Sequence, residues 1–245
     1  MRLAYKIKRA WTLLDRRTLA VKKGICPFCG TSLIIKLADN SISVRCVRCH
    51  ASALHMSIGQ VLKKLVPDIA DKYVYEMSSR GPYFEFLKSR CRYLTVSEYF
   101  DDVLPGSFKG GVQCQDVHRL TYPDQCFDIC TSTEVFEHVA DDLKGFAEMR
   151  RILRPGGLFV FTVPLSDVAT TVQRAELIDG KPRHLLQPEY HGDVIRGERK
   201  VLVFRDYGSD IVDRLRHAGF SSARLMKVDD SEWWGLGRPV VIAER

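Results

Sequence analysis

The sequence predicts an α/β protein built on a mainly parallel β-sheet, with a small metal-binding module ahead of it. Residues 127–163 read as a short apolar strand, a polar turn, a helix, a Pro-Gly-Gly break and a second strand. This order is the crossover unit of a parallel sheet. Before it, two C-x-x-C pairs show the spacing of a zinc site. The 245 residues suffice for one sizeable domain and a small one.

The first 23 residues are set apart by their charge. They carry eight lysines and arginines and one aspartate, which accounts for the whole net charge of +7. An apolar stripe runs through them at helical spacing: Leu3, Ile7, Ala10, Trp11 and Leu14. We therefore predict that residues 1–23 form a basic amphipathic leader helix. It either contacts an anionic membrane or a polyanion, or packs on the protein body with a solvated basic face, and the second is the commoner use of such a helix.

The bulk composition is that of a soluble globular protein, with 45% hydrophobic and 27% charged residues. Apolar runs fall short of the roughly 20 residues that span a bilayer, and the basic N-terminus lacks the apolar core of a signal peptide. Eight cysteines then favour a reducing compartment over a disulfide framework. We expect a cytoplasmic protein, peripheral at the membrane only through its leader. Outside the leader the charges sum to zero, so nucleic acid is not favoured as a partner.

Residues 24–56 are predicted to form a zinc-ribbon-like module. Cys26, Cys29, Cys46 and Cys49 make a C-x2-C-x16-C-x2-C pattern. Two C-x-x-C turns bring four thiolates to one ion, and a closed tetrahedral set leaves no open position, so Zn²⁺ here would be structural. Metal binding would supply folding energy that so short a segment lacks. Free or disulfide-bonded cysteines are the alternative, which the match of both pairs and their separation disfavours.

Residues 57–245 are predicted to form the α/β domain. In the helix of its crossover unit, Val139, Leu143, Phe146 and Ile152 make an apolar stripe. Residues 165–200 are too long for a plain connection and are predicted to form a lid over a substrate. The other predicted elements are the helices Ser57–Leu65, Tyr83–Ser89 and Ser209–Ala218 and the strands Lys72–Met77, Tyr93–Ser97, Val112–Cys114, Val201–Phe204, Ala223–Val228 and Pro239–Ala243.

The stretch Phe127–Pro164, FDICTSTEVFEHVADDLKGFAEMRRILRPGGLFVFTVP, resembles the class I S-adenosylmethionine (SAM)-dependent methyltransferases of types 11 and 12. In that family an xxEVxEHV segment follows the fourth strand, and LRPGG precedes the fifth. The resemblance implies a Rossmann-like, seven-stranded, mostly parallel sheet of order 3-2-1-4-5-7-6 with an antiparallel seventh strand. It also implies SAM as cofactor and methyl transfer as activity.

The resemblance assigns cofactor-binding residues to the first two strands. Glu76 keeps the family's acid ahead of its glycine-rich loop, in which Ser78 and Gly81 are small but Arg80 departs from the pattern. That departure puts cofactor binding in doubt. Glu98 follows Glu76 by 22 residues, the usual distance of an acid that accepts bonds from ribose hydroxyls. A solvent-facing strand-end glutamate is the alternative.

Further cofactor contacts are implied at the next strand ends. Tyr99 would stack on adenine, Asp116 would bind its amino group, and Val117 would pack on its ring. Thr131 and Thr133 would emerge beside the cofactor.

Candidates for the chemistry are His138, Tyr190 and His191. An imidazole can act as general base near neutral pH. The alternative for His138 is a structural bond at a helix start, and for the lid residues a loop held by backbone bonds.

The leading hypothesis is a SAM-dependent methyltransferase acting on a small molecule or a glycan-type acceptor, at a hydroxyl. One alternative is an RNA or protein methyltransferase that docks through the ribbon and the leader. Another is a non-catalytic binding protein that kept the fold but not the glycine loop. The acceptor and the oligomeric state do not follow from the sequence.

Overall fold

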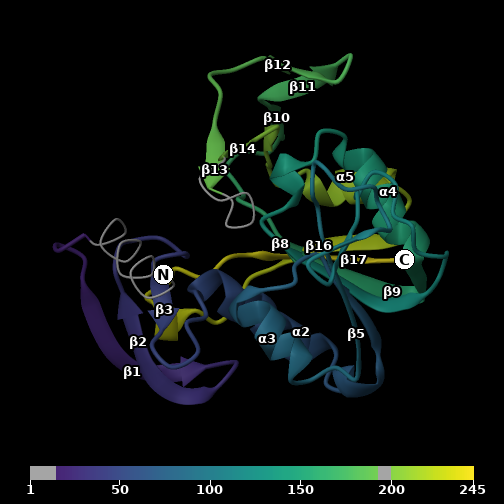
Figure 1. The fold of residues 1–245 in the computed structure, drawn as a ribbon. Helices are drawn as coiled ribbons and strands as arrows, with labels where there is room; N and C mark the ends of the chain where they lie inside the picture. The colour runs from purple at the N-terminus through teal and green to yellow at the C-terminus, as the bar shows by residue number, and fades with distance from the viewer. Residues whose placement is uncertain (1–14, 193–199) are drawn as a thin grey trace. The chain divides into compact units, whose positions relative to one another are not determined.

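The computed structural model of the protein describes residues 15–192 and 200–245 (Figure 1). Most of the predicted leader helix lies outside these ranges. The described chain forms two compact units. The first comprises the residues up to Ala70, Arg80–Cys91 and Met226–Val240, and the second comprises Asp71–Ser79, Arg92–Leu225 and Val241–Arg245. The units therefore do not separate at the predicted boundary after residue 56.

The first unit contains a three-stranded antiparallel sheet of order β1-β2-β3. Strand β1 begins at Ala20, inside the stretch predicted as leader helix, because Ala20–Lys23 pair in register with Leu33–Lys36. The predicted leader helix is therefore wrong for its last four residues. The elements of this unit are β1 (Ala20–Cys26), β2 (Gly30–Lys36), β3 (Val44–Cys46), α2 (Ala53–Leu65), α3 (Gly81–Lys88) and η3 (Ser231–Trp233).

Helix α2 begins four residues earlier than predicted because a capping box precedes it. The Ser52 hydroxyl accepts the His55 backbone N–H, and the His55 ring accepts the Ser52 backbone N–H at 3.2 Å. The C-terminal segment of the chain completes the core of the unit, because Trp233 is 1% exposed among Ile34, Val44 and Met56.

The second unit is built on an eight-stranded sheet of order β6-β7-β5-β4-β8-β9-β17-β16. Numbered along the chain without the short edge strand β6, this is 3-2-1-4-5-7-6, as predicted. β4 is parallel to β5 and β8, β8 is parallel to β9, and β17 is antiparallel to β9. The strands are β4 (Tyr73–Glu76), β5 (Tyr93–Glu98), β6 (Phe108–Lys109), β7 (Val112–Cys114), β8 (Phe127–Thr133), β9 (Leu153–Thr162), β16 (Ser222–Met226) and β17 (Val240–Glu244).

Helices α4 (Asp142–Ile152) and α5 (Ile211–His217) lie side by side in this unit (Figure 1). Phe136, Phe146, Phe159 and Phe161 form the centre of its core, with ring centroids 4.2 to 5.9 Å apart. Two short 3-10 turns complete the inventory: η1 (Ile69–Asp71) and η2 (Phe136–His138).

The LRPGG motif was predicted as a helix stop ahead of a strand, but the strand already begins at Leu153. The Arg154 guanidinium binds the Asp128 carboxylate at 2.9 Å, which ties the start of β9 to β8. A Cβ at Gly157 would lie 2.9 Å from the carbonyl oxygens of both Arg154 and Asp128. The second glycine is therefore required for the close approach of these two strands.

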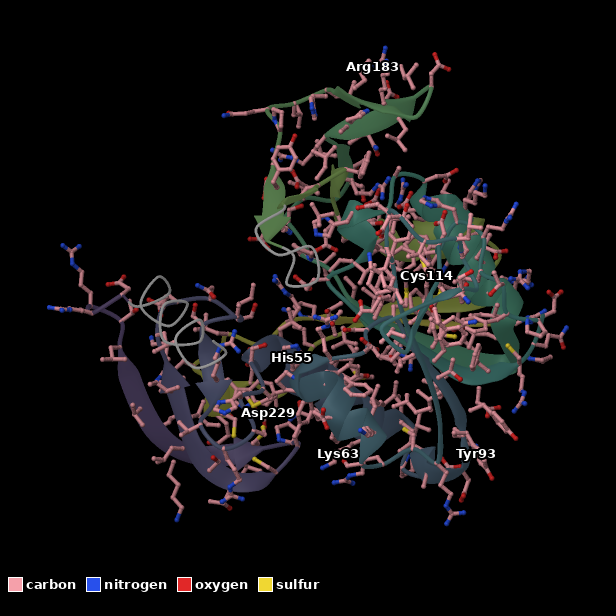
Figure 2. The ribbon with its side chains drawn as sticks, viewed as in Figure 1. His55, Lys63, Tyr93, Cys114, Arg183 and Asp229 are labelled. Atoms are coloured by element: carbon pink, nitrogen blue, oxygen red, sulfur yellow. The ribbon has the colours of Figure 1, made fainter. Side chains whose placement is uncertain are left out.

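The predicted lid consists of short antiparallel pairs. Its β13 and β14 pair with each other and not with the central sheet, so the predicted strand Val201–Phe204 belongs to the lid. The hairpin β11–β12 projects from the rest of this unit, and it carries the exposed Arg183 labelled in Figure 2. The lid strands are β10 (Val172–Gln173), β11 (Ala175–Ile178), β12 (Lys181–His184), β13 (Tyr190–Gly192), β14 (Lys200–Leu202) and β15 (Arg205–Asp206). Among the described residues, no helix has the length and apolar character needed to cross a membrane.

Candidate active site and metal centres

Three neighbouring strands bring acidic and polar side chains to one edge of the sheet. β4 ends at Glu76, β5 at Glu98 and β8 at Thr133. Because these strands are parallel, their carboxyl ends meet at the same edge, which is where α/β sheets bind ligands.

Glu76 is 1% exposed and sits beside a second acid. The pKa of its carboxyl group is raised to about 8, chiefly by burial and also by the charge of Glu98, while the Thr131 hydroxyl bond acts to lower it. Thr131 is fully buried, and its hydroxyl binds Glu76. Thr131 therefore contacts Glu76, another residue that was predicted to bind the cofactor.

Glu98 is 5% exposed, so it is not the solvent-facing glutamate of the alternative interpretation. Its Oε1 accepts two hydrogen bonds from Ser79, one from the backbone N–H and one from the hydroxyl, both at 2.8 Å. A serine in the place of a loop glycine thus binds the carboxylate predicted for the ribose. Ser78 lies next to it and is partly exposed.

The remaining residues predicted to contact the cofactor differ in their partners and in their exposure. Asp116 Oδ1 accepts the backbone and ring N–H groups of His118 at 2.9 and 2.8 Å. These bonds hold the pKa of Asp116 below its usual value. Val117 is 8% exposed and packs in the core, whereas Tyr99 is 48% exposed. Thr133 is partly exposed at the end of β8.

Gly81 belongs to the first unit, where it is the first residue of α3. Its φ of 92° lies in the left-handed region that favours glycine.

The structure brings His138 and His191 together, although 52 residues separate them in the sequence. Their rings meet edge to face with centroids 5.0 Å apart. Glu137, which the sequence analysis did not single out, completes the cluster. Its Oε1 lies 3.6 Å from His138 Nε2 and 3.8 Å from His191 Nδ1. The sequence could have indicated Glu137, because this residue closely follows the carboxyl end of a strand and stands next to a histidine.

Tyr190 is the third predicted catalytic residue, and it neighbours His191 on β13. Successive side chains of a strand point to opposite faces. Because His191 faces the cluster, Tyr190, which is 45% exposed, points away from it. The structure therefore supports His191 and not Tyr190 at this cluster.

A buried arginine fixes the turn that carries Glu137 and His138. Arg205 donates to the carbonyl oxygens of Phe136 at 3.1 Å, Val139 at 2.5 Å and Ala140 at 2.6 Å. Asp142 is also buried, and it accepts from Arg214 at 2.5 Å, which lowers the pKa of Asp142 against the effect of burial. This network was not predicted, because its partners are contributed by separate elements.

The four ribbon cysteines converge in the first unit. Their sulfur atoms all lie within 4.8 Å of one another, with Cys26–Cys49 and Cys29–Cys46 each at 3.5 Å. Tetrahedral bonds of 2.3 Å to zinc would place sulfurs about 3.8 Å apart. The set therefore fits a zinc ion, and it is a set of free thiols rather than disulfides.

The sheet order, the antiparallel β17 and the acids at the ends of β4 and β5 define the class I methyltransferase fold. The family model described as a methyltransferase domain matches residues 79–161. An S-adenosylmethionine-dependent methyltransferase from Mesorhizobium loti has the same fold, with a TM-score of 0.50 and 15% identity, covering 77% of this chain and 98% of that one. The second unit of this chain thus has the fold of the class I SAM-dependent methyltransferases, and residues 79–161 match the methyltransferase-domain family model.

Two curated relatives show the range of the sequence likeness. Malonyl-(acyl-carrier protein) O-methyltransferase of Hamiltonella defensa is 26% identical over 208 residues, which cover 74% of this chain and 80% of the relative. Demethylmenaquinone methyltransferase of Mycobacterium sp. (strain KMS) is 34% identical over 71 residues, 28% of this chain and 31% of the relative. The chain covers 17% and 31% of the first two curated relatives.

Proposed function

We propose that the protein is a SAM-dependent methyltransferase that methylates a hydroxyl of a small-molecule or glycan-type acceptor. The observation that carries this proposal is the Glu137–His138–His191 cluster, which follows the carboxyl end of β8. The same edge of the sheet carries Glu98. A nucleoside-binding acid and a proton-handling cluster at one edge of the sheet are what methylation of a hydroxyl requires.

SAM, when bound, supplies a methyl group that is already electrophilic because it is carried by a sulfonium. The residues present fit its nucleoside part, because a carboxylate and an exposed aromatic ring stand next to each other at Glu98 and Tyr99. Glu98 would bind the ribose hydroxyls and Tyr99 would stack on the adenine. The cluster would then hold the acceptor hydroxyl and promote loss of its proton.

The relatives support a small or carrier-bound acceptor. Their names refer to demethylmenaquinone and to a malonyl group on acyl-carrier protein. The hydroxyl in our proposal rests on the cluster, since an amine acceptor would not need a base.

We also infer that Cys26, Cys29, Cys46 and Cys49 hold a structural zinc ion. Four thiolates leave no position for a substrate, so the ion would stabilise the first unit and take no part in the chemistry. Metal analysis of freshly purified protein should give one zinc per chain. A ratio near zero in folded protein would contradict the inference.

The test of the main proposal is calorimetric titration with SAM and with its demethylated product. We expect micromolar binding, weakened about tenfold in Glu98→Gln because a charge-assisted hydrogen bond is lost. Glu244→Gln is the matched control. It ends β17, which is antiparallel to β9, and it pairs with Leu158, so it lies toward the other end of the sheet's parallel strands.

One observation favours a second candidate, a binding protein without methyltransferase activity. Ser79 already donates two hydrogen bonds to Glu98 Oε1, where the ribose would bind. If the zinc-loaded, folded protein gives no detectable heat with SAM, this second candidate replaces the first.

An RNA or protein acceptor, with docking through the leader, is tested by an RNA mobility shift. Deletion of residues 1–14 suits this test, since β1 begins at Ala20. A salt-dependent shift that disappears on deletion would favour that alternative.

A further inference from the structure

We propose that Glu137, His138 and His191 bind a divalent first-row transition metal cation, distinct from the zinc of the four cysteines. The proposal deepens the function proposed above and rests on it for the cation's role, but not for its binding. One carboxylate and two imidazoles make the ligand set, and all three side chains lie in the methyltransferase domain. Three protein ligands leave open positions for a substrate.

The first argument is the orientation of His138. Its Nδ1 lies 2.8 Å from the carbonyl oxygen of Leu202. A carbonyl only accepts hydrogen bonds, so Nδ1 carries the proton and donates. The lone pair of the neutral ring is then on Nε2, the atom that faces Glu137. A histidine whose outer nitrogen donates to a backbone carbonyl is oriented as metal-binding histidines are.

His191 is oriented in the same sense by a different partner. Its Nε2 lies 3.3 Å from the Glu189 carboxylate, and its Nδ1 faces Glu137 at 3.8 Å. The carboxylate accepts, so Nε2 donates and the lone pair is on Nδ1. Glu189 is itself held by Arg174 at 3.3 Å. Both imidazoles thus direct a lone pair toward the same buried carboxylate.

The second argument comes from the distances. The two nitrogen-to-oxygen separations of 3.6 and 3.8 Å are too long for hydrogen bonds. Ligands bound at about 2.1 Å to one tetrahedral ion are about 3.4 Å apart, so a small contraction would complete the site. The Glu137 carboxylate is 1% exposed, and a cation between these atoms would offset the cost of burying its charge.

The turn that carries the first two ligands is rigid. Arg205 binds the carbonyl oxygens on both sides of it, and the backbone N–H of Phe204 donates to the Glu137 carbonyl at 2.8 Å. The third ligand comes from the lid strand β13. The cation would therefore link the lid to the turn after β8.

For the reaction, the cation would be the means by which the cluster promotes loss of the acceptor's proton, because it would lower the pKa of a coordinated acceptor hydroxyl. The acceptor hydroxyl gives its proton to solvent. Its oxygen then forms the new O–CH3 bond while the S–CH3 bond breaks and the sulfonium becomes a neutral thioether. The acceptor class is a hydroxyl compound able to coordinate a metal.

The experiment titrates full-length protein that contains one zinc per chain with Mn²⁺, followed by the electron paramagnetic resonance signal of the free ion, and with Co²⁺, followed by its visible absorption. We expect one added ion per chain, without release of the ribbon zinc. His191→Ala should weaken binding at least about tenfold. His184→Ala, an exposed histidine of the same lid, is the matched control and should bind as the wild type does.

Two more variants keep the result decisive. Glu137→Gln removes the buried charge and should abolish binding. Glu189→Gln should weaken it about tenfold through the orientation of His191 alone. The proposal is overturned if neither ion binds, or if both ions bind the His191 and Glu137 variants as tightly as the wild type.

SAM titration separates this proposal from the proposed function. Protein that binds SAM but no second metal retains its proposed function and loses the metal site. Protein that binds the metal at this cluster but not SAM retains the metal site and loses its proposed function.

Discussion

Replacing Glu76 by glutamine should make the protein more stable relative to the wild type as the pH rises. Burial raises the pKa of Glu76 from 4.5 to about 8 in the folded state. Between these values the folded protein retains a proton that the unfolded chain releases, so the wild type loses stability with rising pH. Glutamine is neutral in both states and removes this dependence.

The magnitude follows from the size of the shift. Each pH unit inside the window contributes about 1.4 kcal/mol. At pH 7 the wild type would have lost about 3 kcal/mol relative to pH 4.5, and by pH 8 about 4 kcal/mol. The remaining acids are common to both proteins, so the difference between their free energies of unfolding isolates position 76.

The assay is urea unfolding of wild type and Glu76→Gln at pH 5, 6, 7 and 8, with equal m-values required at each pH. The Glu244→Gln variant, half-buried toward the other end of the sheet's parallel strands, should show a difference that stays nearly constant. A flat difference for Glu76→Gln, or one that falls as the pH rises, would refute the reasoning.

Three other substitutions test the packing described above. Arg205→Met should cost about 3 kcal/mol in urea unfolding, because three buried carbonyl oxygens lose their donor; a loss below 1 kcal/mol would contradict the role given to this network. Gly59→Ala would normally stabilise a helix by about 1 kcal/mol, but here the new Cβ would lie 2.2 Å from the Phe28 ring. We therefore expect a lower melting temperature. A higher melting temperature would show that the Phe28 ring moves aside easily. Cys46→Ser should abolish zinc binding at the four-cysteine cluster, and the backbone amides of β1 to β3 should then lose their protection from hydrogen exchange. Cys126→Ser, outside the cluster, should change neither property.

The strands and the helix of the crossover unit could be predicted well because their signals lie in short stretches of neighbouring residues. The crossover unit from Phe127 to Thr162 repeats the helical and strand periods clearly, and its two ends are marked by polar or breaking residues. The strand order came with the family resemblance, and the structure confirms it. The helix stop at Leu153 is confirmed, but the following strand begins there and not at Leu158, because the glycines that normally break structure here permit two strands to approach closely.

The sites were predicted in part. Spacing alone predicted that the four cysteines lie together, and their sulfur atoms are all within 4.8 Å of one another. It could not pair His138 with His191, because the segment that carries His191 has no periodic signal, and Glu137 becomes a candidate only through that pairing. The same limit applies to Trp233, whose place in the core of the first unit depends on contacts with residues near the other end of the chain.

That placement of Trp233 has a consequence for biosynthesis. The four cysteines of the first unit are translated before the second unit, yet part of the first unit's core is supplied by Met226–Val240, which are translated after residues 92–225 of the second unit. During synthesis the four cysteines can meet a metal ion while the hydrophobic groups that cover their sheet are still missing. Metal binding by the four cysteines and completion of this unit are thus separated in time by the translation of residues 92–225 of the second unit, and a chain truncated before residue 226 would retain the cysteines without the core that supports them.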